Sequence, residues 1–359
     1  MKDKIISISF VAVLFIILIT TILTPDEKIS KTERRSLYTL PKLNYQTLAN
    51  GNYLESLEKY NLDQIIFREN FRKMKINYEL NIINKLDSNN LYVANNHIFK
   101  IDNVINQKSI KNFTDKINNI NNIYFKDMKV YYSIIPPKDY YLKSNIHLKL
   151  DFNKLNNTIH DNLNNMKYID LIQHLDLNSY YNTDTHWKQE KLENVVNQLA
   201  INMNFINSKV EYKKKYYEPF YGVYYGQLLR DIKADKITYL TADFMDNVQI
   251  TSLENKITTI YNLDNLNSLD PYNIFLSGAE AIIEINNDAS TSSSELIIFR
   301  DSYGSSLAPL LISSYKKITL IDLRYISSDL ALNKIELKNQ DVLFIYSTLL
   351  INNSFSLKT

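Results

Sequence analysis

The sequence predicts an α/β fold with a mostly parallel β-sheet, preceded by one membrane-spanning helix. Near the carboxyl end, short apolar runs rich in Ile, Leu and Val alternate with helix-like stretches; these runs are "ELIIFRDS", "KITLIDLR" and "DVLFIYST". Such alternation is typical of βαβ units, whose parallel strands are covered by helices on both faces. With 45% hydrophobic and 22% charged residues, the 359-residue chain can fold around one large core or two modest ones.

The uncharged apolar stretch from Ile5 to Leu23 is a membrane anchor or a signal peptide. At about 1.5 Å per residue it spans about 30 Å of hydrocarbon. A cleaved signal needs a shorter apolar region and small residues at the cleavage site, which "TTILTPDEK" lacks. We therefore expect an uncleaved anchor. Lys2 and Lys4 indicate a cytoplasmic amino terminus, although "ERR" at 33–35 weakens that rule. The expected location is the cell membrane, with one pass and the rest of the chain outside the cell.

The expected domains are a transmembrane anchor over 1–24, a linker over 25–50 and one extracytoplasmic domain over 51–359. Between residues 52 and 86 apolar side chains recur at helical spacing, which predicts two amphipathic helices. These side chains are Leu54, Leu57, Phe67, Phe71, Met74, Tyr78 and Ile82.

Further elements follow along the chain. "LYVANNHIFKI" predicts two short strands about a turn at Asn95 and Asn96. "KVYYSIIPPK" predicts a buried strand that ends at Pro136 and Pro137, because proline lacks the N–H donor that a strand needs. "MKYIDL" predicts another strand, and "QEKLENVVNQLAINM" predicts a helix. In a parallel sheet, functional residues collect at the carboxyl ends of the strands.

Composition excludes several functional classes. The net charge is +2, from 41 basic and 39 acidic residues without a long run of one sign, so a nucleic-acid partner is not expected. The absence of cysteine excludes thiol nucleophiles, zinc-thiolate sites and disulfides. Five glycines form neither G-x-G-x-x-G nor a Walker pattern, and the five histidines show no metal-binding spacing. We therefore expect neither a metal nor a cofactor.

Two motifs together supply the parts of a nucleophilic site. In "LIIFRDSYGSSLAP", Ser302 stands where an apolar strand turns into a helix, and backbone N–H groups at a helix start can stabilise an oxyanion. A serine needs a base, usually a histidine that is held by a carboxylate. In "SYYNTDTHWKQE", Asp184 and His186 are two positions apart, so an extended segment directs both to one side.

Each motif alone also has a structural interpretation. Asp301 and Ser302 can cap the following helix, and "DTHW" can be a helix entry in which Trp187 packs. Their joint occurrence favours a Ser-His-Asp site. The Tyr-rich "EYKKKYYEPFYGVYYGQ" predicts either a carbohydrate-facing surface or, as a structural feature, a pair of Tyr-rich strands or a surface loop.

At these residues the chain resembles a known family. "NTDTHWKQE" resembles the D-H-H-W signature of the DHHW proteins of Gram-positive bacteria, and "IFRDSYGSSLAPLL" followed by "KITLIDLRY" resembles their serine block. Those proteins are similar to the SGNH-hydrolase-like acetyltransferases of alginate and cell-wall polysaccharides. The resemblance implies an SGNH-like, flavodoxin-like three-layer sandwich with Asp184, His186 and Ser302 as the triad.

The departures from the family pattern concern the oxyanion hole and the order of the motifs. Thr185 replaces the first His of D-H-H-W, and Arg300 stands where the glycine of G-D-S would be. Asp184 and His186 precede the serine, which implies a permuted topology. The candidates for oxyanion or substrate contacts are Gly222, Arg300, Tyr303 and Trp187.

The resemblance implies a membrane-anchored extracytoplasmic O-acetyltransferase that acts on a cell-surface polysaccharide of the cell envelope. Because acetyl-CoA is cytoplasmic, it also implies a membrane-bound O-acyltransferase as the partner that donates the acetyl group. Two alternatives remain open at this point. One is a carbohydrate acetyl esterase with the same triad, and the other is a non-catalytic glycan-binding or assembly protein.

Overall fold

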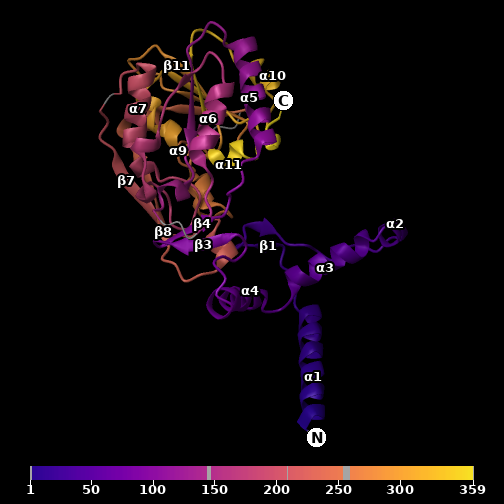
Figure 1. Ribbon diagram of the computed structural model, residues 1–359. Coiled ribbons are helices and arrows are strands. Elements are labelled where there is room, and N and C mark those ends of the chain that lie inside the picture. The colour runs from indigo at the N-terminus through magenta and orange to yellow at the C-terminus, as the bar shows by residue number, and fades with distance from the viewer. Residues whose placement is uncertain (1, 144–146, 208, 254–258, 359) are drawn as a thin grey trace. The chain divides into compact units, whose positions relative to one another are not determined.

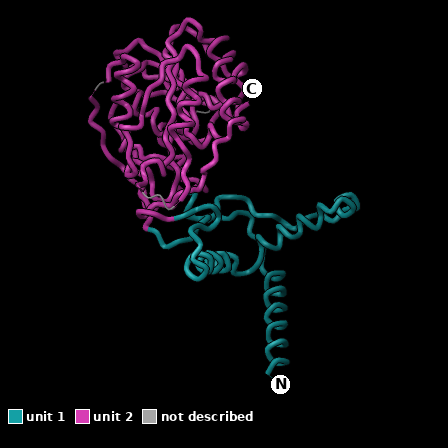
Figure 2. Tube along the Cα trace, in the orientation of Figure 1, with its two compact units in different colours: residues 1–92, 223–232 teal, residues 93–222, 233–359 magenta. Residues whose placement is uncertain are grey.

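The computed structural model describes residues 2–143, 147–207, 209–253 and 259–358 (Figure 1). The chain forms two compact units (Figure 2). Unit 1 comprises residues 1–92 and 223–232, and unit 2 comprises residues 93–222 and 233–359. This division follows packing, and the domain limits at 24 and 50 stay a prediction.

Unit 1 contains the apolar amino-terminal helix α1 and a set of short elements. Their bounds are α1 Lys2–Leu23, β1 Ile29–Ser30, β2 Arg35–Ser36, α2 Tyr45–Ala49, α3 Asn52–Gln64, α4 Arg68–Asn77, the π-helix η1 Tyr78–Ile82 and α8 Tyr225–Leu228. The two helices predicted between 52 and 86 are confirmed as α3 and as α4 continued by η1. In the described part of the chain, α1 is the one helix long and apolar enough to cross a membrane. A signal sequence at this place meets the same test, so the uncleaved anchor stays a prediction.

Unit 2 is built on a seven-stranded sheet of order β6-β5-β13-β11-β12-β10-β9. The first five strands in that order pair in parallel, whereas β10 is antiparallel to both β12 and β9. The bounds are β5 Val130–Ile135, β6 Lys167–Tyr168, β9 Gln249–Ser252, β10 Ile282–Asn286, β11 Glu295–Arg300, β12 Lys317–Ile321 and β13 Asp341–Ser347. The predicted α/β fold with a mostly parallel sheet is confirmed.

Helices cover both faces of this sheet, as the alternation of side chains along β11 shows. Leu296 and Ile298 belong to the core cluster that α7 completes, while Ile297 and Phe299 belong to the cluster that α5 and α6 complete. Successive strand residues point to opposite faces, so a strand that is apolar throughout needs two cores. The helices of unit 2 are α5 Gln107–Tyr124, α6 Phe152–Asn162, α7 Glu193–Met203, α9 Ser302–Leu307, α10 Ser328–Leu332 and α11 Thr348–Ile351.

Two hairpins complete the chain. β3 Leu91–Ala94 and β4 His97–Lys100 form the predicted pair, with Asn95 and Asn96 at positive φ in the turn. The Tyr-rich segment forms β7 Lys213–Phe220, which pairs antiparallel with β8 Asp235–Thr241. The segment thus contains one strand of a pair whose partner lies outside it, and a carbohydrate-facing surface stays a prediction.

We expect Gly304→Ala to lower the thermal midpoint of unfolding. A Cβ at Gly304 would lie 2.5 Å from the Cβ of Arg300 and 3.0 Å from its Cγ. Overpacking of this kind costs about 1–3 kcal/mol. Thermal unfolding of the full-length protein in detergent, followed by the fluorescence of the single tryptophan, Trp187, measures the shift.

Ser305→Ala is the matched control in the same helix. The Ser305 hydroxyl is buried and finds no hydrogen-bond partner among the described residues, so its removal should leave the midpoint unchanged or higher. An unchanged midpoint for Gly304→Ala would contradict the close packing of α9 on Arg300.

Candidate active site

Ser302 is the first residue of α9, directly after strand β11. Asp301 caps this helix: its Oδ1 accepts from the Tyr303 N–H at 3.1 Å, and its Oδ2 accepts from the Ser347 N–H at 2.9 Å. A buried apolar strand followed by an Asp cap therefore fixes Ser302 at the carboxyl edge of the sheet. Ser302 is partly exposed there, while Asp301 is buried.

The structure brings the three predicted triad side chains together. The Nε2 atom of His186 lies 2.7 Å from the Ser302 Oγ, and its Nδ1 atom lies 2.6 Å from the Asp184 Oδ1. A carboxylate only accepts hydrogen bonds, so Nδ1 carries the proton and Nε2 is free to accept from the hydroxyl. Asp184 is 1% exposed and His186 is 9% exposed. This arrangement can remove the Ser302 proton.

A buried aspartate holds the loop that carries Asp184 and His186. Asp235, the first residue of β8, accepts from the Asn182 N–H at 2.8 Å, the Thr183 N–H at 2.7 Å and the Thr183 hydroxyl at 2.6 Å. Asp235 could not be predicted, because it lies about 50 positions away from this loop in a strand without a motif.

Lys138 holds the same loop through its carbonyl groups. Its buried Nζ donates to the Asp184 carbonyl at 2.8 Å and to the Tyr181 carbonyl at 3.1 Å. Burial lowers the pKa of Lys138 to about 7, and the nearby Asp184 and Asp235 oppose that shift. The only sequence signal was its position after the double proline that ends β5.

Gly222 lies against the same loop. A Cβ at Gly222 would lie 2.3 Å from the Asp184 Cβ, so only glycine allows this approach. The Gly222 N–H donates to the Thr183 hydroxyl at 2.8 Å. That contact directs its one hydrogen at Thr183, so the oxyanion role expected for Gly222 stays a prediction that this contact does not favour.

Aromatic rings enclose the imidazole. Tyr272, in the short 3-10 helix η8 Pro271–Ile274, stacks on His186 with ring centroids 3.9 Å apart and 11° between the planes. The Tyr303 ring lies 4.9 Å from the same imidazole, and its hydroxyl donates to the Thr185 carbonyl at 2.7 Å. Tyr303 was among the predicted site residues. Tyr272 was missed because it belongs to no recognisable motif.

Trp187, the residue after His186, holds helix α9 through hydrogen bonds of its indole. Its Nε1–H donates to the Tyr303 carbonyl at 3.1 Å and to the Ser306 hydroxyl oxygen at 2.9 Å, and Ser306 also accepts from the Tyr272 hydroxyl at 2.8 Å. The indole is fully buried. The structure therefore gives Trp187 a packing and positioning role, and a substrate contact of the indole stays a prediction.

Arg300 is also buried, at 1% exposure. Its guanidinium lies 3.4 Å from the Asp322 carboxylate and donates to the Gly278 carbonyl at 3.4 Å. Burial lowers the pKa of Arg300. Asp322 also binds the partly exposed Arg324 at 2.6 Å. These contacts place the guanidinium in the core, and a contact of Arg300 with substrate stays a prediction.

No family model matches the chain, nor does any curated protein match its sequence. Its fold is similar to that of a DHHW family protein from Eubacterium siraeum, with 20% identity and a TM-score of 0.62 over 76% of this chain and 97% of the other. It is also similar to Bacillus cereus PatB1, with 19% identity and a TM-score of 0.58 over 73% and 96% of the two chains.

The fold is similar, too, to that of Bacillus cereus PatB1 with a sulfonyl adduct, with 18% identity and a TM-score of 0.60 over 75% of this chain and 98% of the other. At these identities the likeness concerns the fold. The resemblance to DHHW proteins that the motifs indicated is thus confirmed at the level of the fold.

We expect Lys138→Met to remove a pH-dependent part of the stability. The pKa of Lys138 is about 7 in the folded chain, whereas an unfolded lysine has a pKa near 10.4. Between these values the unfolded chain binds more protons, so the free energy of unfolding rises with pH. From about pH 7 to about pH 9 the wild type should gain roughly 2 kcal/mol relative to Lys138→Met.

Denaturant unfolding of the full-length proteins at both pH values, followed by Trp187 fluorescence, measures this difference. Lys111→Met is the control, because Lys111 is exposed on α5 and pairs only with Asp115 at the surface. The control should keep the wild-type pH dependence. The same pH dependence in the wild type and Lys138→Met would contradict a desolvated amine at this position.

Proposed function

We propose that this chain is a membrane-anchored extracytoplasmic O-acetyltransferase that acts on a hydroxyl of a cell-surface polysaccharide. The observation that carries the proposal is the continuous hydrogen-bond geometry from Asp184 through His186 to Ser302, at 2.6 Å and 2.7 Å. The similar fold of a DHHW family protein supports it. The sulfonyl adduct of PatB1 supports it as well, because sulfonyl electrophiles react with activated nucleophiles.

The proposed reaction has two half-reactions. First, His186 Nε2 takes the proton of the Ser302 hydroxyl while Oγ attacks the acetyl carbonyl of the donor. The imidazolium then protonates the leaving group, which leaves an acetyl ester on Ser302. Second, a sugar hydroxyl gives its proton to His186 and attacks this ester. The imidazolium returns the proton to Ser302 Oγ, and Asp184 stabilises the charged ring in both steps.

The acetyl donor is proposed to be a membrane-bound O-acyltransferase, as the family resemblance implies. The proposed anchor is α1, in the orientation that leaves the site outside the cell. In the uncleaved chain, Thr21 in the last turn of α1 accepts from the Ile66 N–H at 3.2 Å. Removal of the helix would take this partner from the half-buried Ile66 N–H.

We expect a small activated acetyl ester to acetylate the full-length wild type on Ser302. The adduct should appear by mass spectrometry on the peptide that contains Ser302, and Ser302→Ala and His186→Ala should lack it. Ser305→Ala is the matched control in the same helix and should keep it. An adduct of equal yield in Ser302→Ala would refute the nucleophile.

Addition of an acceptor distinguishes transfer from hydrolysis. If the chain is a transferase, a polysaccharide or oligosaccharide should discharge the acetyl ester faster than water does and should itself become acetylated. Discharge by water alone at an unchanged rate would favour the acetyl esterase. No adduct and no ester turnover would favour the non-catalytic binding protein.

Tyr272 should act as a positioning residue through its ring and not through its hydroxyl. A cationic imidazole against an aromatic face gains about 0.5–2 kcal/mol, so Tyr272→Leu should slow formation of the acetyl ester by about 2- to 30-fold. Tyr272→Phe keeps the stacked ring and should stay near the wild-type rate. A rate series with the donor ester measures both variants. Equal losses in the two variants would assign the effect to the bond with Ser306 instead.

A further inference from the structure

The helical segment of α4 and η1 exposes an apolar face to solvent. Its members recur every three or four positions, as on one side of a helix. We call them the apolar face; they are Phe67, Phe71, Met74, Tyr78 and Ile82, with exposed fractions of 64%, 40%, 65%, 53% and 68%. A helix of a water-soluble protein normally buries such a face and exposes its charges. Here the arrangement is inverted.

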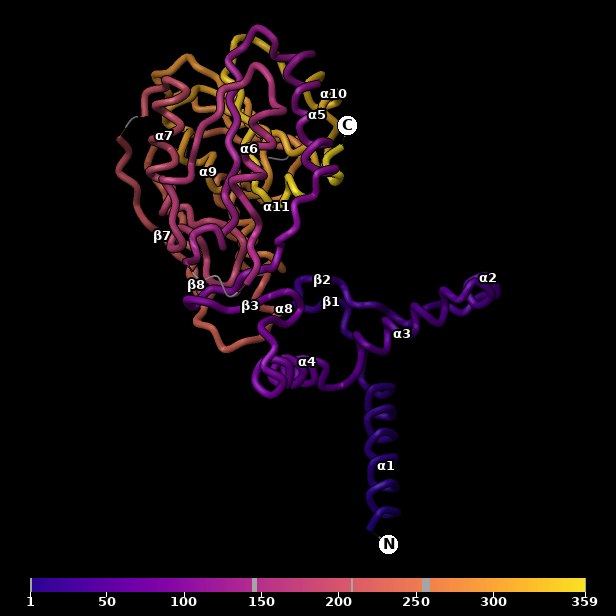
Figure 3. The backbone as a smooth tube through the Cα atoms, in the orientation of Figure 1, coloured from indigo at the N-terminus to yellow at the C-terminus, as the bar shows by residue number. Residues whose placement is uncertain are grey.

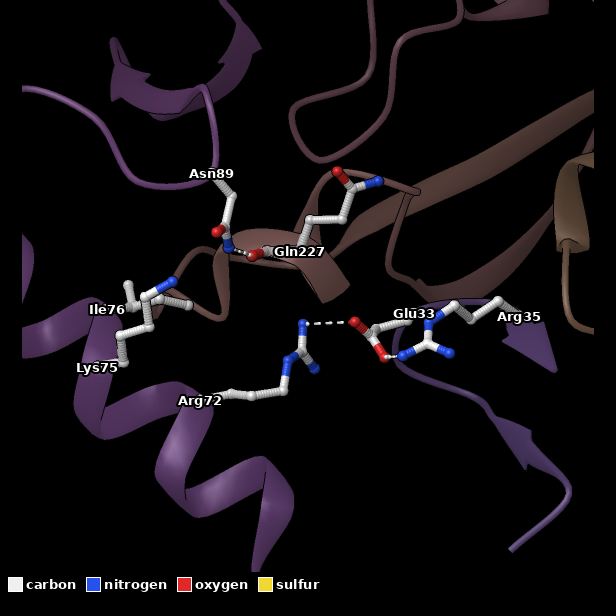
Figure 4. A pocket seen from close by; sticks show the side chains of 7 residues that line it. All are labelled: Glu33, Arg35, Arg72, Lys75, Ile76, Asn89 and Gln227. Carbon is white, nitrogen blue, oxygen red and sulfur yellow. Dashed lines mark hydrogen bonds and ion pairs between the residues drawn. The ribbon is translucent and has the colours of Figure 1, made fainter. Parts of the chain in front are cut away.

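Charged side chains occupy the opposite, inward side of the same helix. Arg68 and Arg72 both bind Glu33, and Arg72 also donates to the Gly226 carbonyl at 2.7 Å. Figure 4 shows Arg72 reaching from the helix toward Glu33, with Ile76 on the wall of the same cavity. Ile76 is 2% exposed. Because these contacts fix the rotation of the helix, it cannot turn to bury the apolar face within unit 1.

The apolar face begins where α1 ends. The Ile66 N–H donates to the Thr21 hydroxyl at 3.2 Å, one residue before Phe67. Thr24 and Pro25 line the same cavity of about 550 Å³ as Phe67. In Figures 1 and 3, α4 lies at the level of the carboxyl end of α1 and not along its length. The exposed apolar side chains thus continue from the end of the helix that can span a membrane.

The position of the apolar face at the end of α1 indicates that lipid covers it. A helix of 22 residues is about 33 Å long, so a spanning α1 brings its carboxyl end to the boundary between hydrocarbon and headgroups. Side chains at that level meet lipid. Phe and Tyr are suited to this boundary, and the exposed Lys73 and Lys75 beside them are suited to anionic headgroups.

We propose that α4 and η1 form an interfacial helix, whose apolar face is embedded in the outer surface of the bilayer next to α1. The chain would then hold the membrane at two places, the spanning helix and the interfacial helix. A single spanning helix can rotate about its axis, whereas two contacts fix the orientation of unit 1. This inference rests on the proposed membrane-spanning α1, but it goes beyond acyl transfer and does not depend on it.

The test uses the complete absence of cysteine from the chain. Single cysteines replace Phe71, Met74 or Ile82 in the full-length protein, which is labelled with a nitroxide and placed in vesicles of phosphatidylcholine and phosphatidylglycerol. Accessibility to oxygen, which partitions into lipid, is compared with accessibility to a water-soluble nickel complex. Labels on the apolar face should lie about 5–10 Å deep in the headgroup and acyl boundary.

Ile201 supplies the matched control. It is apolar and 76% exposed, but it lies on α7 of unit 2. A label there should be more accessible to nickel and less accessible to oxygen than a label that lies in lipid. Unchanged Trp187 fluorescence would show that the labelled chains are folded. Acetylation of Ser302, measured on the same chains, tests the acyl-transfer proposal separately.

Nickel accessibility at all three positions, equal to that at Ile201, would overturn the proposal. Burial of the labels with strong dipolar broadening between chains would also overturn it, because a second copy would then cover the face. Burial that occurs only when another membrane protein is added would assign the face to that partner instead of to lipid.

Discussion

The site depends on one loop, residues 181–184, whose backbone is held by two buried ionisable side chains, Asp235 and Lys138. Asp235 accepts from its N–H groups, and Lys138 donates to its carbonyl groups. Each charge alone would be costly to bury, and each is satisfied by several polar partners. Because the backbone is fixed in this way, Asp184 and His186 are presented at hydrogen-bond distance to Ser302 without any regular element beneath them. The Gly222 N–H, the Tyr303 hydroxyl and the stacked Tyr272 ring add to the hold of the two ionisable side chains on the loop and its imidazole.

The sheet determines the position of Ser302, because hydrogen bonds join the carboxyl ends of its central strands. Asp301 reaches from the end of β11 to the Ser347 N–H at the end of β13, and the Thr348 hydroxyl donates to the Ile135 carbonyl at the end of β5 at 2.7 Å. The first contact anchors the turn that carries Ser302 to β13, and the second ties the end of β13 to β5. Ser302 therefore lies at the end of the sheet, and His186 follows the loop that Asp235 and Lys138 hold.

Local sequence patterns predicted the three triad residues. The residues that surround them are brought there by long-range packing, which no local pattern reveals. Ser302 follows an apolar strand, and Asp184 and His186 are two positions apart, so each motif could be read within a dozen residues. Tyr272 and Asp235 come from segments without such patterns and reach the site only through the fold. The parallel sheet was predictable because both faces of each strand are apolar. Arg300 could not be placed, since the end of a strand can direct a side chain either to the site or to the core.

The two units are stabilised in different ways, and this difference explains why covering the apolar face would stabilise unit 1. Unit 2 has apolar clusters on both faces of its sheet and needs no further cover. Unit 1 relies instead on ion pairs such as Arg35 with the buried Asp63, at 2.5 Å. Ion pairs near the surface contribute only about 0–1 kcal/mol each, whereas full burial of one large apolar side chain contributes about 1.5–3 kcal/mol. Outside α1, the five exposed side chains of the apolar face are thus a large source of stabilisation that unit 1 does not use. A bilayer that covers them would supply the burial that the unit does not find within itself.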